Sequence, residues 1–363
     1  MSHSQDPSEA ERLCEEGYAF LEAGRVDEAA ARLHRALELA PTNPLIHYRL
    51  GLLFSDTGRP AEAVKALDAV VALQPDNARA HNNRGSALQL LGRNAEAETA
   101  FRRALTLAPH LDLPYVNLGK LLEHQGKLDQ AVELYKLALA NGLDAPVFRH
   151  YLAAASGQVT DRAPAGWVRD TFDNFAPLFD ERLRDLQYDA PRQLAALVQS
   201  RTAGPLDILD VGCGTGQCGI ALAMIRRRLV GIDLSEKMLA RAREHRIYDE
   251  LHAVEMQTWL SGAAAESFDL VIAGDVFVYV GDLESTFRDV ARILRRRGLF
   301  AFSTEECSEA DYTLLSTGRY AQSHAYISRL AQTSFSVVDA QPTVVRKESG
   351  KPLAGRLFLL ERR

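Results

Sequence analysis

The sequence predicts two folded parts, an all-α array of repeated helices followed by an α/β domain. The first prediction rests on a 34-residue period, which is visible when Gly17, Gly51, Gly85 and Gly119 are read together. The second rests on residues 206–226, where an apolar strand runs directly into a glycine-rich turn and then into a helical pattern. A period of this length indicates stacked pairs of helices, and a strand-turn-helix unit indicates a nucleotide-binding type of domain.

The repeats are marked by further positions with the same spacing. Small residues let two antiparallel helices touch, a glycine ends the first helix of each unit, and a proline separates one unit from the next. The further positions are Gly24, Gly58, Gly92 and Gly126, then Ala29, Ala63, Ala97 and Ala131, and finally Pro41, Pro75 and Pro109. This pattern resembles tetratricopeptide repeats. The resemblance implies an array over residues 1–155, with repeats at about 10–43, 44–77, 78–111 and 112–145 and a capping helix.

The resemblance also implies a superhelix whose concave face holds a protein or peptide partner. The sixth position of the four units holds Glu15, Arg49, Asn83 and Asn117. In related arrays, asparagines at this position grip the backbone of an extended peptide, so Arg49, Asn83 and Asn117 are the candidate partner contacts. Three alternatives stay open: these are ordinary solvated polar residues, the array packs against its own α/β domain, or it mediates self-association.

Residues 156–205 are expected to form a linker and short lid helices before the α/β domain. Gly157 and Pro164 punctuate the start of this segment. Phe172, Phe175 and Phe179 follow at helical spacing. These aromatic residues either cover a ligand pocket and exclude water from it, or pack the segment against the sheet.

The α/β domain, residues 206–363, opens with the clearest chemical signal in the chain. Leu206–Val211 reads as a buried strand, and Gly212, Gly214 and Gly216 let the backbone turn sharply beneath a ligand. The glycines alone fit NAD as well, because Asp233 lies about 20 residues beyond Gly214, as the dinucleotide pattern expects.

Asp210 decides between the two cofactors. A carboxylate at the end of this strand repels a pyrophosphate and attracts the ammonium group of an amino acid, which favours S-adenosylmethionine. The stretch from Leu209 to Gly216 closely resembles motif I of the class I S-adenosylmethionine-dependent methyltransferases, and the resemblance covers residues 206–363. It implies a Rossmann-like fold with a mostly parallel seven-stranded sheet, closed by a hairpin of residues 335–346 and 355–360.

The same resemblance implies the cofactor contacts. Asp233 is expected at the ribose hydroxyls, Glu255 at the adenine amino group, Met256 at the adenine ring, and Asp275 and Tyr279 near the methyl group. The full set of implied contacts is Asp210, Gly212, Cys213, Gly214, Gly216, Asp233, Leu234, Met238, Glu255, Met256, Asp275 and Tyr188. Two of these contacts have an alternative structural explanation. Asp275 is equally placed to cap a short helix, and Cys213, with Cys218, suits turn packing because no cluster completes a metal site.

The segment from Tyr312 to Tyr326 is polar and aromatic, and related enzymes build their acceptor pocket at this place. His324 is a candidate base because a histidine exchanges protons near neutral pH. Arg319 is a candidate partner for an acceptor carboxylate. Tyr279 completes the catalytic candidates. The alternatives are a helix-terminal or packing role for His324 and a core role for Tyr279.

The predicted activity is methyl transfer from S-adenosylmethionine to an acceptor left open among proteins, peptides, carrier-bound intermediates and small molecules. The absence of an Asn-Pro-Pro-Tyr motif at Gly274–Phe277 argues against amide and exocyclic-amine acceptors. Two alternatives remain. One is a repeat scaffold whose second domain has lost catalysis, disfavoured by the intact glycines and Asp233, and the other is an NAD-binding oxidoreductase, disfavoured by Asp210.

The composition limits which partners and which cellular compartment we expect. The formal net charge is −6 and neither part of the chain is basic, so no nucleic-acid partner is expected. The basic runs Arg226–Arg228 and Arg292–Arg297 are interpreted as solvated helix ends. No membrane span or signal peptide is visible, and the 4 cysteines are scattered as in reducing compartments. We therefore expect a cytoplasmic protein without a membrane partner.

Overall fold

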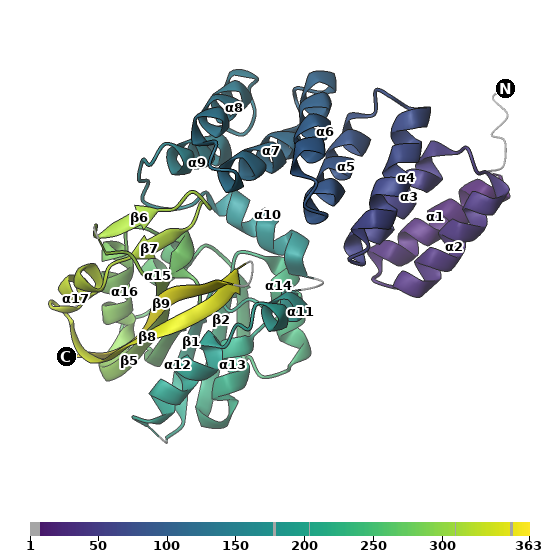
Figure 1. The fold of residues 1–363 in the computed structure, drawn as a ribbon. Helices are drawn as coiled ribbons and strands as arrows, with labels where there is room; N and C mark the ends of the chain where they lie inside the picture. Colours follow the sequence, from purple (N-terminus) through teal and green to yellow (C-terminus); the bar gives the residue numbers. More distant parts are fainter. Residues whose placement is uncertain (1–7, 177–178, 203, 309, 349–350) are drawn as a thin grey trace, which may run out of the picture. The chain divides into compact units, whose positions relative to one another are not determined.

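The structure, a computed structural model, describes residues 8–176, 179–202, 204–308, 310–348 and 351–363. Contacts between residues divide the chain into two units, Met1–Ser156 and Gly157–Arg363. The first unit consists of helices alone, and the second contains helices around a sheet (Figure 1). The predicted fold class, an all-α array followed by an α/β domain, is therefore confirmed.

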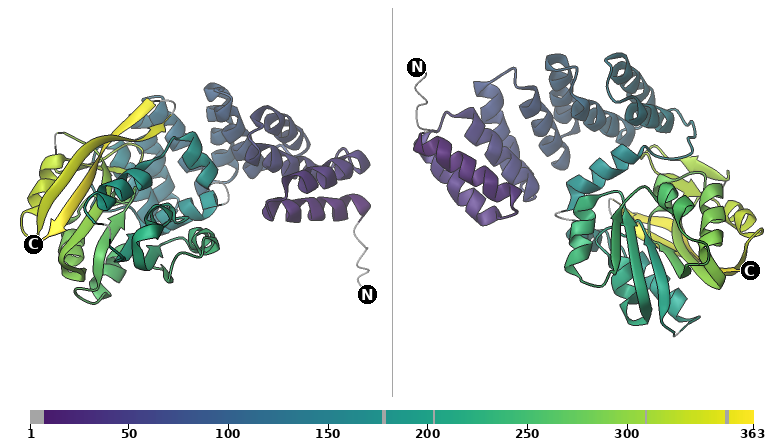
Figure 2. Two further views of the ribbon diagram at one scale, coloured as in Figure 1. Left: turned by 90° about the horizontal axis from the view of Figure 1, so that it is seen from below. Right: turned by 180° about the vertical axis from the view of Figure 1, so that it is seen from behind.

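The first unit is a series of antiparallel helix pairs that follow the 34-residue period. Within each pair the two helices pack against each other, and each pair also packs against the next. Figures 1 and 2 show this stacking as a row of paired helices, running from purple to blue. The helices are α1 (Glu9–Glu22), α2 (Val26–Leu39), α3 (Pro44–Asp56), α4 (Pro60–Leu73), α5 (Ala78–Leu90), α6 (Asn94–Leu107), α7 (Asp112–His124), α8 (Leu128–Ala140) and α9 (Ala145–Ala155).

Glycine is required for different physical reasons in the two glycine series, the one that contains Gly85 and the one that contains Gly92. A Cβ atom at Gly85, in α5, would lie 2.6 Å from the Phe101 ring of α6, so this glycine lets the two helices approach. Gly17, Gly51 and Gly119 meet the second helix of their own repeat in the same way. Gly92 has open space around it but a φ of +73°, so it supplies the left-handed residue that ends α5.

The second unit contains a seven-stranded sheet in the order β3-β2-β1-β4-β5-β9-β8. The first five of these strands run parallel, whereas β9 is antiparallel to both β5 and β8. The strands are β1 (Leu206–Val211), β2 (Arg226–Asp233), β3 (Glu250–Ala253), β4 (Phe268–Ala273), β5 (Leu294–Glu305), β8 (Phe335–Glu348) and β9 (Lys351–Arg362). A separate hairpin pairs β6 (Tyr312–Leu314) with β7 (Tyr320–Gln322).

Both faces of the sheet are covered by helices, because side chains alternate along each strand. Ile208 and its neighbours on one face pack against α12 (Ala190–Gln199) and α13 (Gln217–Leu222). Leu209 and its neighbours on the other face pack against α15 (Met256–Gly262), α16 (Glu284–Ile293) and α17 (His324–Ala331). The remaining helical segments are α10 (Ala165–Phe175), α11 (Phe179–Asp185), α14 (Glu236–Glu244) and the short turns Ala223–Ile225 and Phe277–Tyr279.

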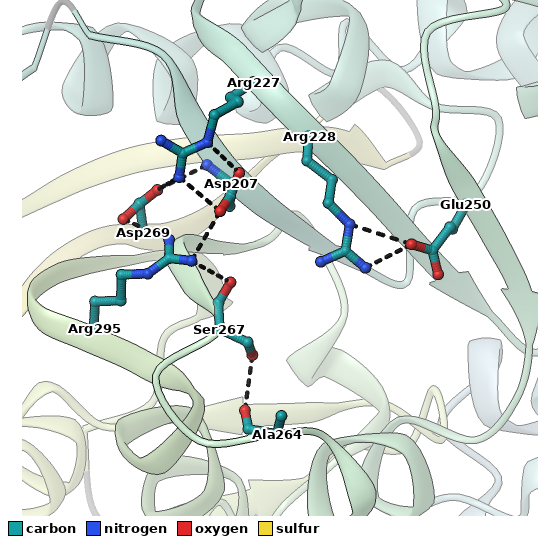
Figure 3. A network of polar contacts seen from close by, with 8 residues as sticks. All are labelled: Asp207, Arg227, Arg228, Glu250, Ala264, Ser267, Asp269 and Arg295. Atoms are coloured by element: carbon teal, nitrogen blue, oxygen red, sulfur yellow. Dashed lines mark hydrogen bonds and ion pairs between the residues drawn. The ribbon is translucent and has the colours of Figure 1, made fainter.

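The interpretation of the two arginine runs as helix ends holds for Arg292, which lies in the last turn of α16, but was wrong for the arginines of 226–228 and 295–297, which lie in β2 and β5. Arg227 is the second residue of β2 and Arg295 the second residue of β5. Both form ion pairs with Asp207 of β1 and Asp269 of β4, at 2.6 to 3.0 Å (Figure 3). Four neighbouring parallel strands are thus joined at their amino ends. Among the described residues, no helix is both long and apolar enough to cross a membrane.

Candidate active site

A cavity of about 450 Å³ lies at the carboxyl ends of the parallel strands, where ligands bind in open α/β sheets. Its walls come from α10, α11 and the loops that follow β1, β2, β3 and β4. Most residues singled out from the sequence line this cavity. They are Tyr188, Gly212, Cys213, Gly214, Asp233, Leu234, Glu255, Met256, Asp275, Tyr279 and Arg319.

The glycine-rich turn after β1 forms the floor of the cavity. Gly212, Gly214 and Gly216 have φ values of +58°, +54° and +95°, which side-chain-bearing residues adopt only at a cost. A Cβ atom on Gly212 would lie 2.6 Å from Val276, so this position also needs glycine for space. Gly216 does not line the cavity; it is the N-cap of α13.

Asp233, the last residue of β2, is held by two backbone amides. The N–H of Gly214 donates to Oδ2 at 2.9 Å, and the N–H of Ser235 donates to Oδ1 at 2.8 Å. Burial raises the pKa of Asp233, while these amide hydrogen bonds oppose the rise. Each oxygen keeps a lone pair for further donors, so the carboxylate can bind hydroxyl groups inside the cavity.

Asp210 does not line the cavity, which corrects the direct role expected for it. Side chains alternate along β1, so Asp210 shares the face of Ile208 and lies beneath the turn. Its Oδ2 accepts a 2.6 Å hydrogen bond from Tyr248 Oη, whereas Oδ1 has no hydrogen-bond partner among the described residues. Burial raises the pKa of Asp210 to about 7.

One wall of the cavity is apolar, with Leu234, Val254 and Met256. Glu255 lies beside them as the N-cap of α15, where its carboxylate accepts from the N–H of Thr258 at 2.7 Å. Met238 was expected in this group, but that prediction was wrong. It is fully buried in α14 and does not reach the cavity.

An ion cluster also borders the cavity, which Asp275, Arg319 and Arg346 line. Arg346 of β8, 3% exposed, donates to both oxygens of Asp275 at 2.9 Å and also bonds Glu305 of β5. Arg319 pairs with Glu305 at 3.7 Å. Asp275 has a φ of +58° and does not cap the short turn that follows it, because Val276 holds that position. The sequence interpretation missed both Arg346 and Glu305.

Two tyrosines border this ion cluster. Tyr188 and Tyr279 both line the cavity, and burial raises the pKa of Tyr279 to about 12. His324, the expected base, lies elsewhere: it is exposed at the start of α17 and stacks on Phe358, so that prediction was wrong in placing it at the chemistry. Burial raises the pKa of both Tyr188 and Tyr279, so neither tyrosine exchanges a proton readily near neutral pH.

Helices α10 and α11, the segment expected to form a lid, contribute aromatic side chains to the cavity. Phe172, Phe175 and Phe179 all line it, and Phe172 packs edge-on against Tyr279 with ring centroids 5.6 Å apart. These two helices are also joined to the loops that follow β1 and β2. Asp180 of α11 accepts from Thr215 Oγ1 at 2.6 Å, and Asp173 of α10 accepts from Ser235 Oγ at 2.5 Å.

The partner candidates of the repeat array are engaged within the array. Arg49 is 9% exposed and donates to Glu15 at 2.7 Å. Asn83 donates to Tyr48 Oη at 3.0 Å, and Asn117 donates to the carbonyl oxygen of the Asn82 side chain at 3.0 Å. The two asparagine side chains are half-buried and form a continuous polar line across neighbouring repeats.

Sequence comparisons agree with the fold and the cavity. Residues 209–302 match the methyltransferase domain family, and residues 20–85 and 76–142 match tetratricopeptide repeat families. The chain therefore carries a methyltransferase domain of the S-adenosylmethionine-dependent class together with tetratricopeptide repeats.

Individual relatives match only part of the chain. A malonyl-[acyl-carrier protein] O-methyltransferase from a Methylovorus species is 27% identical over 187 residues, which are 47% of this chain and 63% of that protein. A ubiquinone biosynthesis O-methyltransferase from Aromatoleum aromaticum is 32% identical over 139 residues, which are 37% of this chain and 56% of that protein. The chain thus spans less than two thirds of the length of these relatives.

Solved structures give similar partial matches. Magnesium protoporphyrin IX methyltransferase from Synechocystis PCC 6803, solved with bound SAH, is 19% identical with a TM-score of 0.42; the match covers 55% of this chain and 99% of that one. The first repeat domain of Spaghetti, bound to an HSP90 peptide, is 24% identical with a TM-score of 0.32; the match covers 34% of this chain and 99% of that one.

Proposed function

We propose that this protein transfers the methyl group of S-adenosylmethionine to a small or carrier-linked acceptor, and that its repeats dock the protein that carries or accompanies the acceptor. The observation that carries the proposal is the cavity. It brings the glycine-rich turn, a carboxylate at the end of β2, an apolar wall and an aromatic lid around one space.

The residues present fit the cofactor. Asp233 suits the two ribose hydroxyls, because its oxygens are oriented by amides and still accept hydrogen bonds. Leu234 and Met256 suit the flat faces of adenine, with Glu255 beside them. Gly212 and Gly214 line the cavity and suit the amino-acid portion above the turn. When bound, S-adenosylmethionine supplies an electrophilic methyl group.

The acceptor end of the cavity binds and orients rather than exchanging protons. Phe172 and Tyr279 form an apolar wall, and Arg319 and Arg346 lie at its polar end. Such a wall excludes water and fixes the acceptor in line with the methyl group, which is the main requirement of a displacement reaction. Two of the relatives carry O-methyltransferase names, one of them for a carrier-bound acid, and this supports an oxygen acceptor.

Calorimetric titration with S-adenosylmethionine, S-adenosylhomocysteine and NAD tests the cofactor. We expect both sulfur compounds to bind and NAD not to bind. If none binds, the repeat scaffold without catalysis replaces the proposal. Labelled S-adenosylmethionine then reports methyl transfer to proteins and small molecules captured with the full chain, and a chain with Asp233→Ala is the control for transfer that depends on this site.

A further inference from the structure

A tyrosine that no sequence pattern singled out lies directly beneath the glycine-rich turn. Tyr248 belongs to the loop between α14 and β3, and it is half-buried. Its ring fills the hollow between three glycines. A Cβ atom would lie 2.5 Å from the tyrosine Oη at Gly219, 2.8 Å from its ring at Gly231 and 3.1 Å from its ring at Gly216. These glycines therefore make room for Tyr248 below the turn.

The hydroxyl of Tyr248 connects this ring to Asp210, the acid near the end of β1. It donates to Asp210 Oδ2 at 2.6 Å, and Asp210 is 1% exposed. The carboxylate also receives a backbone hydrogen bond from Gly219, whereas its Oδ1 has no partner among the described residues. A loop about 40 residues along the chain, on the far side of β2, thus supplies the side-chain hydrogen bond to this carboxylate.

We infer that Tyr248 is a positioning residue of the cofactor site: its ring supports the glycine-rich turn from below, and its hydroxyl orients the Asp210 carboxylate under the bound amino-acid portion of the cofactor. This inference rests on the proposed S-adenosylmethionine site. Asp210 acts through the turn and its charge rather than by touching the ligand, since its side chain lies outside the cavity.

The arrangement makes cofactor affinity depend on pH. Burial raises the pKa of Asp210 to about 7, and the Tyr248 hydrogen bond opposes this rise by favouring the ionised form. The other titratable groups that face Asp210 are Asp233, Cys213, Cys218 and Tyr188. Burial raises the pKa of all four, so both thiols and the phenol stay neutral near pH 7, which leaves Asp233 as the group to be controlled for.

The test is the dissociation constant of S-adenosylhomocysteine, measured by calorimetry from about pH 6 to pH 8. The wild-type chain is compared with Tyr248→Phe, Asp210→Asn and the double variant. Tyr248→Phe keeps the ring and removes only the hydroxyl. We expect the wild-type affinity to fall towards the acidic end. In Tyr248→Phe the midpoint of this fall should move to higher pH, and the affinity at neutral pH should drop several-fold.

The Asp210→Asn background separates orientation of the carboxylate from packing. Adding Tyr248→Phe to it should change neither the affinity nor its pH profile. A wild-type affinity and midpoint in Tyr248→Phe would overturn the inference, and so would a midpoint shift that persists without the Asp210 carboxylate. If Tyr248→Phe does not fold, Asp210→Asn alone must remove the pH dependence, or the inference fails. A wild-type chain that binds no S-adenosylhomocysteine at any pH would instead overturn the proposed function itself.

Discussion

Asp233 offers the most direct test of the cofactor site at the level of a single residue. Asp233→Ala removes a carboxylate that accepts from two backbone amides and faces the cavity. We expect S-adenosylhomocysteine binding to weaken by about 1 to 3 kcal/mol, the range for losing charge-assisted hydrogen bonds, without unfolding of the chain. Calorimetry measures the affinity, and thermal denaturation shows whether the variant is still folded. Glu236→Ala, which removes an exposed acid three residues later, is the matched control. An unchanged affinity in Asp233→Ala would show that Asp233 does not bind the ribose hydroxyls.

Asp207 gives a second residue-level prediction, which concerns stability rather than binding. Hydrogen bonds from Arg227 and Arg295 lower the pKa of Asp207 to about 2 (Figure 3). A carboxylate with a lowered pKa stabilises the fold above its unfolded pKa of about 4, and this contribution is lost as the pH falls towards 2. Asp207→Asn should therefore lower the free energy of unfolding by about 1 to 2 kcal/mol at pH 7, because the arginines are partly exposed.

Denaturant titrations of wild type and Asp207→Asn at several pH values check this prediction. The difference between the two proteins should shrink as the pH falls from about 4 to 2. A difference that stays constant with pH would show that Asp207 acts by packing instead of charge.

The site could be predicted from the sequence only where local pattern fixes geometry. Gly212 and Gly214 come just after β1 and Asp233 ends β2, so their place at the sheet edge is given by the fold class. Arg346 could not be found in this way, because it reaches the cavity from β8, more than seventy residues after Asp275. His324 fitted the chemistry by residue type, but the hairpin β6-β7 that precedes it places it on the surface.

At the level of elements, the repeats were predictable because the two helices of each pair approach each other closely at the same position of every repeat. Gly85 and Gly92 in one repeat allow the two glycine roles to be separated. Gly85→Ala places a methyl group 2.6 Å from Phe101 and should destabilise the array by about 1 to 3 kcal/mol through overpacking. Gly92→Ala meets nothing within 4 Å but must adopt a φ near +73°, which costs about 1 to 2 kcal/mol.

Asparagine substitutions distinguish these two causes. Asn tolerates the left-handed region, so Gly92→Asn should recover much of the stability lost in Gly92→Ala, whereas Gly85→Asn should be worse than Gly85→Ala. Thermal denaturation of the array gives the order of stabilities. If Asn rescues both positions equally, the close approach at Gly85 does not limit the packing of α5 against α6.

In the second unit, the roles of the residues at the beginnings of β2 and β5 could not be predicted from the sequence. Arginine runs before a strand resemble the basic last turn of a helix, and only the sheet shows that Arg227 and Arg295 pair with acids of neighbouring strands. The mostly parallel sheet of seven strands, in contrast, was expected from the resemblance at the glycine-rich turn.

For the whole molecule, the division at Ser156 predicts that the two units fold separately. Residues 1–155 should form a helical unit, and residues 157–363 should bind S-adenosylhomocysteine with the affinity of the full chain. The second fragment must keep the residues just before the lid. The backbone carbonyl of Asp161 accepts from the N–H groups of Gly281 and Asp282 at 2.8 and 3.0 Å, and the N–H of Ala163 donates to the Tyr279 carbonyl at 2.9 Å. These contacts hold the loop after β4 that lines the cavity.

A shorter fragment, residues 165–363, is the matched control because it keeps the lid helices and lacks these contacts. We expect its affinity for S-adenosylhomocysteine to fall while circular dichroism still reports the α/β fold. Equal affinity in both fragments would show that the segment 157–164 does not organise the site. Loss of binding in residues 157–363 as well would mean that the repeat array forms part of the active site, since the methyltransferase domain then depends on residues that the domain boundary excludes.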